Sequence, residues 1–279
     1  MSVDIIKVTQ DYKDLIEEIT SNPNREEQRI QTFLEKRPQF LPNVSRINAT
    51  TNHGVYSSLI FPKFSLNGTF RRVPDFMYVT KSSIQACVNF VEIEEPSKKM
   101  FTENNDFNAE FNHAFQQLED WRIWLDEGNN KAFLRTELCR AIQHPLMQTL
   151  PIVFKFILIY GRRSEYETND IRKARLSQKS SDPYQIMSFD RLDYSTFSSS
   201  LICVKKSDEG YYATNVSEDY DYNHPMRATH KHILRKVDAI NSNDYISDER
   251  KAELVNKINQ LDSMSDEDAL KSQLSSFGK

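Results

Sequence analysis

The stretch that decides the fold is PDFMYVTKSSIQACVNFVEIEEP, residues 74–96. It contains two runs rich in β-branched and aromatic residues, which favour β-strands, on either side of the polar turn Lys81-Ser82-Ser83. We therefore predict strands over residues 70–80 and 85–94. An antiparallel hairpin is the simplest way to pair two strands that are joined by so short a turn.

Three acidic residues belong to this predicted hairpin: Asp75 on the first strand, and Glu92 and Glu94 on the second. Side chains alternate along a strand, so Glu92 and Glu94 project to the same side, and Asp75 can approach Glu92 from the neighbouring strand. Carboxylates at close range must share protons, be solvated or bind a cation, and Mg²⁺ is the natural partner of such a cluster. The alternative is ordinary: Pro74-Asp75-Phe76 is a strand entry and the glutamates form a solvated face.

The rest of the chain mixes helices and strands around one very apolar segment. Helices are predicted over residues 11–19, 25–36, 107–126, 132–143, 169–178, 248–261 and 266–274. Further strands are predicted over residues 55–61, 151–160, 185–189, 201–206 and 211–216. Asp190 is expected to cap the helical turn that follows the 185–189 strand. His230 and His232 are expected to be an exposed pair on a strand, because no third metal ligand accompanies them.

This pattern predicts an α/β (α+β) fold with a mixed central sheet flanked by helices. The 38% of apolar residues, with 17 Phe and 12 Tyr among 279 residues, is sufficient for a sizeable core. Neither a GxxxxGK[ST] loop nor a GxSxG elbow occurs in the sequence, which argues against a P-loop nucleotidase and an α/β-hydrolase.

Charge and cysteine usage limit the partners and the compartment. The net charge of −4 gives no general attraction to nucleic acid, so binding would need a local basic surface. Arg71, Arg72 and Arg162 could supply phosphate contacts if their segments meet at one edge. Three widely spaced cysteines indicate reduced thiols in the cytoplasm. No apolar run approaches the roughly 18–20 residues of a membrane helix, so no membrane partner is expected.

The order of the motifs resembles the PD-(D/E)xK nuclease core and, more specifically, the nuclease domain of Shedu-type bacterial antiphage defence proteins. The motifs that carry the resemblance are, in order, Glu27 with Phe33-Leu34-Glu35 and Pro38, Pro74-Asp75-Phe76, Glu92-Ile93-Glu94, Pro96-Ser97-Lys98-Lys99, Gln117 to Trp121, Gly161-Arg162 and Ser188-Phe189-Asp190. Together they cover residues 26–191 and imply a restriction-endonuclease-like core.

The resemblance implies a role for each matching residue. Asp75 and Glu92 would hold Mg²⁺ or Mn²⁺, and Glu27 would add a carboxylate from a helix beside the site. Gln117 would orient the substrate or the attacking water. The implied reaction is metal-assisted hydrolysis of phosphodiester bonds in DNA, carried out by a cytoplasmic homo-oligomer.

The expected domain organisation has three parts. Residues 1–24 are a helical lead-in, residues 25–217 are the nuclease-like domain, and residues 218–279 are a charged, mostly helical appendage.

Glu94 departs from the PD-(D/E)xK pattern, which has lysine at this position. A lysine beside the attacked phosphate contributes positive charge, and glutamate reverses it; at about 4 Å and an effective dielectric near 20, each contact is on the order of 4 kcal/mol. Three solutions are compatible with the sequence. Lys98 or Lys99 reaches into the site from the following loop, Glu94 ligates a second metal ion, or the fold is an inactive module that binds nucleic acid or a protein.

Overall fold

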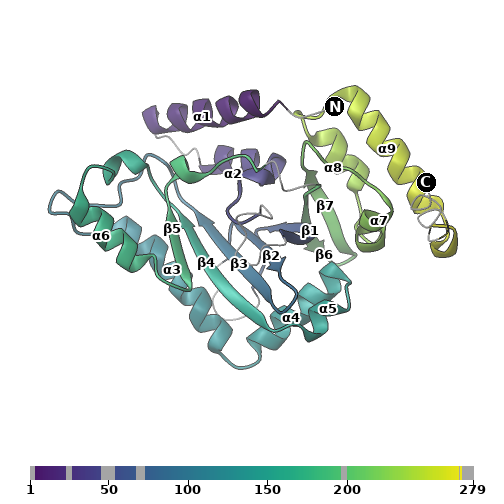
Figure 1. Ribbon diagram of the computed structural model, residues 1–279, viewed down its shortest axis with the longest axis horizontal. Helices are drawn as coiled ribbons and strands as arrows, with labels where there is room; N and C mark the ends of the chain where they lie inside the picture. The colour runs from purple at the N-terminus through teal and green to yellow at the C-terminus, as the bar shows by residue number, and fades with distance from the viewer. Residues whose placement is uncertain are drawn as a thin grey trace.

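A mixed β-sheet forms the centre of the molecule, in the order β5-β4-β3-β2-β1-β6-β7 (Figure 1). The computed structural model describes residues 4–22, 27–44, 54–66, 73–195, 200–269 and 271. The strands are β1 (Val55–Pro62), β2 (Phe76–Lys81), β3 (Ala86–Ile93), β4 (Ile152–Ile159), β5 (Tyr184–Met187), β6 (Ile202–Ser207) and β7 (Gly210–Val216). The predicted mixed α/β architecture is confirmed.

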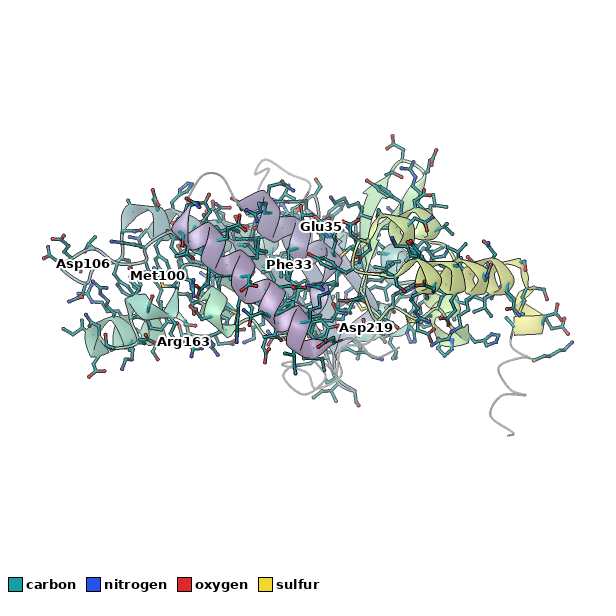
Figure 2. All side chains as sticks on the ribbon, turned by 90° about the horizontal axis from the view of Figure 1, so that it is seen from above. Phe33, Glu35, Met100, Asp106, Arg163 and Asp219 are labelled. Atoms are coloured by element: carbon teal, nitrogen blue, oxygen red, sulfur yellow. The ribbon has the colours of Figure 1, made fainter. Side chains whose placement is uncertain are left out.

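Helices cover both faces of this sheet (Figure 1). On one face lie α1 (Ile5–Ser21) and α2 (Glu27–Lys36), which run side by side when seen from above (Figure 2). On the other face lie α3 (Ala109–Asp126) and α4 (Asn130–Ile142). The remaining helices are α5 (Leu146–Thr149), α6 (Asp170–Lys179), α7 (His224–His230), α8 (Lys236–Ser242) and α9 (Asp248–Ser263). None of the described helices is long and apolar enough to cross a membrane.

Alternate residues of the central strands supply two hydrophobic cores. On β3, Val88 and Phe90 pack in the cluster that contains α3, whereas Val91 and Ile93 pack in the cluster that contains α1 and α2. Every residue of β3 is buried. Because both faces of the strand are covered, its sequence shows a nearly continuous apolar run instead of a polar alternation.

The β2–β3 hairpin has the predicted antiparallel pairing, from Phe76↔Val91 to Lys81↔Ala86. β2 begins at Phe76, so Asp75 lies just before the strand and not within it. β1 is also antiparallel to β2, while β4 is parallel to β3. The first residue of β2 therefore lies at the same sheet edge as the last residues of β1, β3 and β4, and this edge carries the charged residues described below.

The chain after β7 differs from the sequence-based expectation. The predicted strand with an exposed histidine pair is wrong: His230 ends α7 and is fully buried, and Nε2 of His232 hydrogen-bonds to the Ala141 carbonyl at 2.9 Å. Asn223 is the N-cap of α7, because its side chain accepts a hydrogen bond from the Met226 backbone amide. Packing of this helix against β1 then buries His230, and sequence periodicity does not report such a contact.

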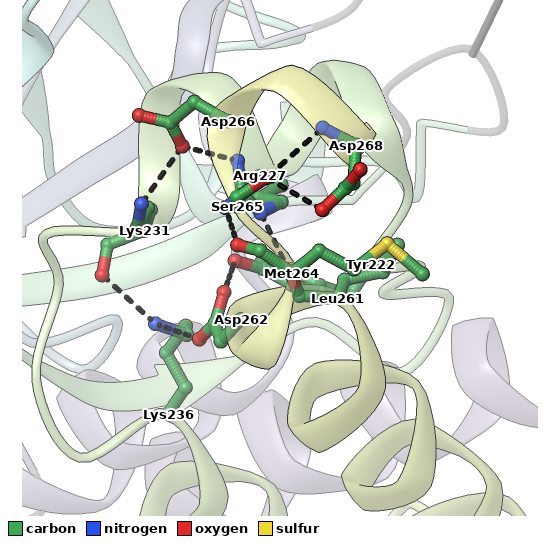
Figure 3. A network of polar contacts seen from close by, with 10 residues as sticks. All are labelled: Tyr222, Arg227, Lys231, Lys236, Leu261, Asp262, Met264, Ser265, Asp266 and Asp268. Carbon is green, nitrogen blue, oxygen red and sulfur yellow. Dashed lines mark hydrogen bonds and ion pairs between the residues drawn. The ribbon is translucent and has the colours of Figure 1, made fainter. Parts of the chain in front are cut away.

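Helix α9 is tied to the rest of the molecule by buried cations (Figure 3). Arg227 donates to the carbonyls of Leu261 and Met264, each at 2.7 Å, and to Asp266 at 2.9 Å. Lys236 pairs with Asp262 at 3.1 Å. Leu254, Ile258 and Leu261 of α9 belong to the same hydrophobic cluster as the α3 face of the sheet.

Candidate active site

Charged residues from separate segments meet at the sheet edge. Lys63 follows β1, Asp75 precedes β2, and Glu92 and Glu94 lie at the end of β3. Glu27 opens α2 and interacts electrostatically with Asp75 and Glu94. Antiparallel pairing on both sides of β2 makes this convergence possible, because it aligns a strand start with two strand ends.

Asp75 is buried and held from two directions. Its Oδ1 forms an ion pair with Lys63 Nζ, and its Oδ2 accepts the Ile93 amide at 2.7 Å. The Lys63 amide also donates to the Asp75 carbonyl at 3.0 Å. Burial raises the pKa of Asp75 above its usual range, although Lys63 and the Ile93 amide act against the rise. The carboxylate is thus fixed in orientation and paired with one cation.

Glu92 is buried and is not satisfied. Its Oε2 has no hydrogen-bond partner in the described structure. Burial, followed by the charges of Asp75 and Glu94, raises the pKa of Glu92 well above its usual range. A buried carboxylate oxygen of this kind is costly unless it is protonated or meets a cation.

Glu94, the residue that replaces the expected lysine, is neutralised from the following loop. Lys98 Nζ lies 2.5 Å from Glu94 Oε2. Burial alone would lower the pKa of Lys98, but its hydrogen bond to Glu94 raises the pKa overall. The loop is held by Gly161, which has φ +56° and where an added Cβ would lie 2.7 Å from the Lys98 carbonyl. Lys98 therefore contacts Glu94 from the following loop.

Lys99 and Gln117, two further residues predicted for the site, make no ion pair or hydrogen bond with the carboxylates in the described structure. Lys99 is exposed, and among the described side chains it makes no ion pair; its carbonyl accepts the Asn108 amide. Gln117 is half-buried on α3, and no hydrogen bond joins it to the carboxylates within the described ranges. Trp121, one turn later, is a core residue packed against Phe90.

The predicted basic contacts have separate outcomes. Arg71 and Arg72 lie outside the described residues. Arg162 is bound to groups of the protein itself: Asp190 at 2.9 Å and the Thr20 hydroxyl at 3.0 Å. The prediction that Asp190 caps a helical turn is wrong, because its carboxylate instead binds Arg162 and the Arg163 amide. The turn spans Phe189–Arg191, so Ser188 and not Asp190 occupies the position before it.

The carboxylates at this sheet edge meet part of what a metal ion requires. In the part of the chain that the structure describes, no group of three or more His, Cys, Asp or Glu side chains is arranged as a metal site. Carboxylates are nevertheless the ligands that Mg²⁺ prefers, and it commonly uses only one or two of them with waters and substrate phosphates. Asp75 and Glu92 fit that requirement, since the unpaired Glu92 oxygen is what a cation would satisfy. Glu27 is half-buried beside them.

Lys63 is the site residue that sequence reasoning missed. It stands in no recognisable motif and is twelve residues from its partner Asp75. The predicted strand at residues 55–61 is the signal that could have found it. If this strand pairs antiparallel with the next one, Lys63 after its end lies beside Asp75 before the start of the next strand.

The family model described as "Shedu protein SduA, C-terminal" matches residues 24–192, more than half of the chain. The match includes Glu27, Lys63, Asp75 and Glu92, whereas α7, α8 and α9 lie beyond it. Among curated proteins, no match to the chain was found.

Proposed function

The chain belongs to the family described as Shedu protein SduA, C-terminal, and from that premise we propose that it is a divalent-metal-dependent nuclease acting on DNA in defence against phage. The observation that carries the proposal is the buried pair Asp75 and Glu92, in which Glu92 Oε2 has no partner within the described structure. Two buried carboxylates with an unsatisfied oxygen favour a cation-binding site over a structural role.

The chemistry divides between the metal ion and the protein. When bound by Asp75 and Glu92, with Glu27 nearby, Mg²⁺ or Mn²⁺ would supply an activated water and neutralise charge on the scissile phosphate. The Ile93 amide keeps the Asp75 carboxylate in one orientation. Lys63 keeps a positive charge beside both carboxylates, and because its side chain is 44% exposed it can also contact a phosphate.

A second candidate function is a nuclease-fold module that binds nucleic acid or a protein without cleavage. The observation that favours it is the pairing of Lys63 with Asp75 and of Lys98 with Glu94. Because lysine ammonium groups already neutralise two of the carboxylates, fewer negative charges remain for a metal ion to neutralise.

The deciding experiment is cleavage of DNA and of RNA with Mg²⁺ or Mn²⁺ by wild type, Asp75→Asn and Glu92→Gln. We expect each substitution to reduce cleavage of DNA by at least about 100-fold, since each removes a charge needed in the transition state. Glu249→Gln, which changes a fully exposed acid at the start of α9, is the matched control and should cleave normally.

Binding measurements separate the two functions. Under the nuclease proposal, Mg²⁺ raises the unfolding temperature of wild type and raises it less in Glu92→Gln. Cleavage that neither substitution affects would remove these residues from the mechanism. A wild type that binds nucleic acid but neither cleaves it nor responds to metal would establish the second function.

A further inference from the structure

A pocket lies beside the candidate active site, at the place where β1 and β6 separate. These parallel strands pair only through Leu59↔Ile202 and Ile60↔Cys203. Beyond these pairs, residues 62–65 and 204–206 line a pocket of about 180 Å³. Lys63 is one of its lining residues and also the ion-pair partner of Asp75, so this lysine links the pocket to the carboxylates.

The pocket has an excess of positive charge. Lys63, Lys205 and Lys206 line it, together with a single acid, Glu137. Glu137 is buried and already bonded to Lys206 at 2.5 Å and to Arg140 at 2.9 Å. Among the described residues, the ion pair of Lys205 is a loose contact of 3.9 Å with Glu35. The three lysines are between 35% and 48% exposed, so an anion can reach their ammonium groups.

Aromatic side chains complete the lining. Phe64, Phe133 and Tyr212 face the pocket with the lysines. Tyr212 is the cross-strand partner of Lys205, and the Arg235 guanidinium lies 5.2 Å from the centre of its ring. Rings that stack bases, combined with cations that pair with phosphates, are the composition of sites for single-stranded nucleic acid.

We propose that this pocket is a nucleotide subsite, which takes one unpaired nucleotide of the substrate strand next to the scissile phosphate. The base would stack on Tyr212. Lys205 lies on the same side of the β6–β7 hairpin as Tyr212 and Lys206 on the opposite side, so these two lysines would contact phosphates on either side of the base, with Lys63 beside the scissile phosphate. A base within a duplex is stacked and paired, so it must be unpaired or already single-stranded to enter so small a pocket. The choice of nucleic acid as occupant rests on the proposed function, but binding in the pocket does not require cleavage.

The test is the binding of labelled oligothymidylate, followed by fluorescence anisotropy in EDTA, so that no cleavage occurs. Tyr212→Ala should weaken binding on the order of ten-fold, and Tyr212→Phe should restore it, because the ring and not the hydroxyl stacks the base. Lys206→Ala should reduce the slope of log K against log salt by about 0.7, the value for one phosphate contact on a single strand.

A matched control is Lys173→Ala on α6. Lys173 is 47% exposed and ion-paired with the exposed Asp170, so it matches the exposure of Lys206, which is 48% exposed and ion-paired with the buried Glu137. This control should leave affinity and salt slope unchanged. An oligonucleotide containing 2-aminopurine adds a direct readout of stacking, since its fluorescence should be quenched by wild type and Tyr212→Phe but not by Tyr212→Ala. Thermal unfolding of each variant identifies any that fail to fold.

The outcomes separate this inference from the proposed function. If folded Tyr212→Ala binds the oligonucleotide with the affinity of wild type and still quenches 2-aminopurine, the subsite is overturned. The nuclease proposal is then left intact. Equal affinity for oligothymidylate and for a duplex of the same length would also overturn the subsite. Tyr212-dependent binding in a protein that cleaves nothing would support the subsite and refute only the nuclease activity.

Discussion

At the scale of single residues, the charge balance around Asp75 decides what the site can do. The resemblance to PD-(D/E)xK nucleases predicts a lysine at position 94, where this chain has glutamate. Lys98 pairs with that glutamate, and Lys63 pairs with Asp75. The two lysines therefore offset the negative charge that Glu94 adds. Of the two, Lys63 is the one whose partner, Asp75, belongs to the buried pair of Asp75 and Glu92. Lys63 is also strained, with φ +51° in a region that non-glycine residues seldom occupy.

Lys63→Ala is expected to lower the single-turnover rate of DNA cleavage by about 100-fold, because it removes a positive charge beside the developing phosphate charge. Lys98→Ala should have a smaller effect, since Lys98 mainly neutralises Glu94. Lys173→Ala is matched to Lys63 in exposure, at 47% against 44%, and should cleave normally. A Lys63→Ala enzyme with the wild-type rate would exclude Lys63 from the mechanism.

At the scale of elements, His230 joins α7 to an irregular part of β1. Ser57 and Ser58 both have positive φ, at +53° and +58°, where the β1–β2 register shifts. The Ser57 carbonyl accepts from Nε2 of His230 at 2.6 Å, and the Tyr220 hydroxyl lies 3.3 Å from Nδ1. A carbonyl can only accept, so Nε2 carries a proton. Burial disfavours the charged form of the ring and so favours the neutral imidazole.

This contact predicts a pH dependence of stability. Burial lowers the pKa of His230 from 6.5 to about 4. As the pH falls from 7 to 5, His230 binds a proton in the unfolded chain but stays neutral in the folded protein. This residue should therefore lower the unfolding free energy by about 2 kcal/mol over that range. Urea unfolding of wild type and His230→Gln at both pH values isolates this contribution, because the other titrating groups are common to both. The difference between the two proteins should shrink at pH 5; a constant difference would contradict the prediction.

At the scale of the whole molecule, the segment after β7 is part of the main hydrophobic core. Tyr220, Tyr222 and Ile240 are buried in the same cluster as the strands, and α8 packs against β7. Arg227 binds the end of α9, through the carbonyls of Leu261 and Met264. Its third partner, Asp266, is 78% exposed, so the carbonyl bonds matter more than this ion pair.

Arg227→Ala should therefore lower the unfolding free energy by about 3 kcal/mol, since it removes buried charged hydrogen bonds to the end of a helix. A decrease of roughly 6–12 °C in unfolding temperature follows for a chain of this size. Lys231→Ala is the matched control, because Lys231 pairs with the same Asp266 but is exposed. Its effect should stay below about 1 kcal/mol. Equal losses in the two variants would show that Asp266, and not the carbonyl pair, anchors α9.

Local sequence was sufficient for most elements and for part of the site. The apolar run that became β4, the hairpin of β2 and β3 and the helices α2, α3 and α6 follow from periodicity, turn residues and breakers, which act over a few residues. Asp75 and Glu92 could be predicted as site residues for the same reason, because a short hairpin brings the start of its first strand beside the end of its second. The small helices α7 and α8 were missed, since their stability depends on packing against the sheet.

The sequence by itself thus determined a mixed α/β chain, its central hairpin and two candidate carboxylates, because these depend on neighbours in the chain. Only the tertiary structure decided that Lys63 pairs with Asp75, that Lys98 neutralises Glu94, and that a basic and aromatic pocket opens between β1 and β6. These features depend on which strands align and where their pairing ends. That alignment is set by burial of both sheet faces at once, a property of the whole fold and not of any one segment.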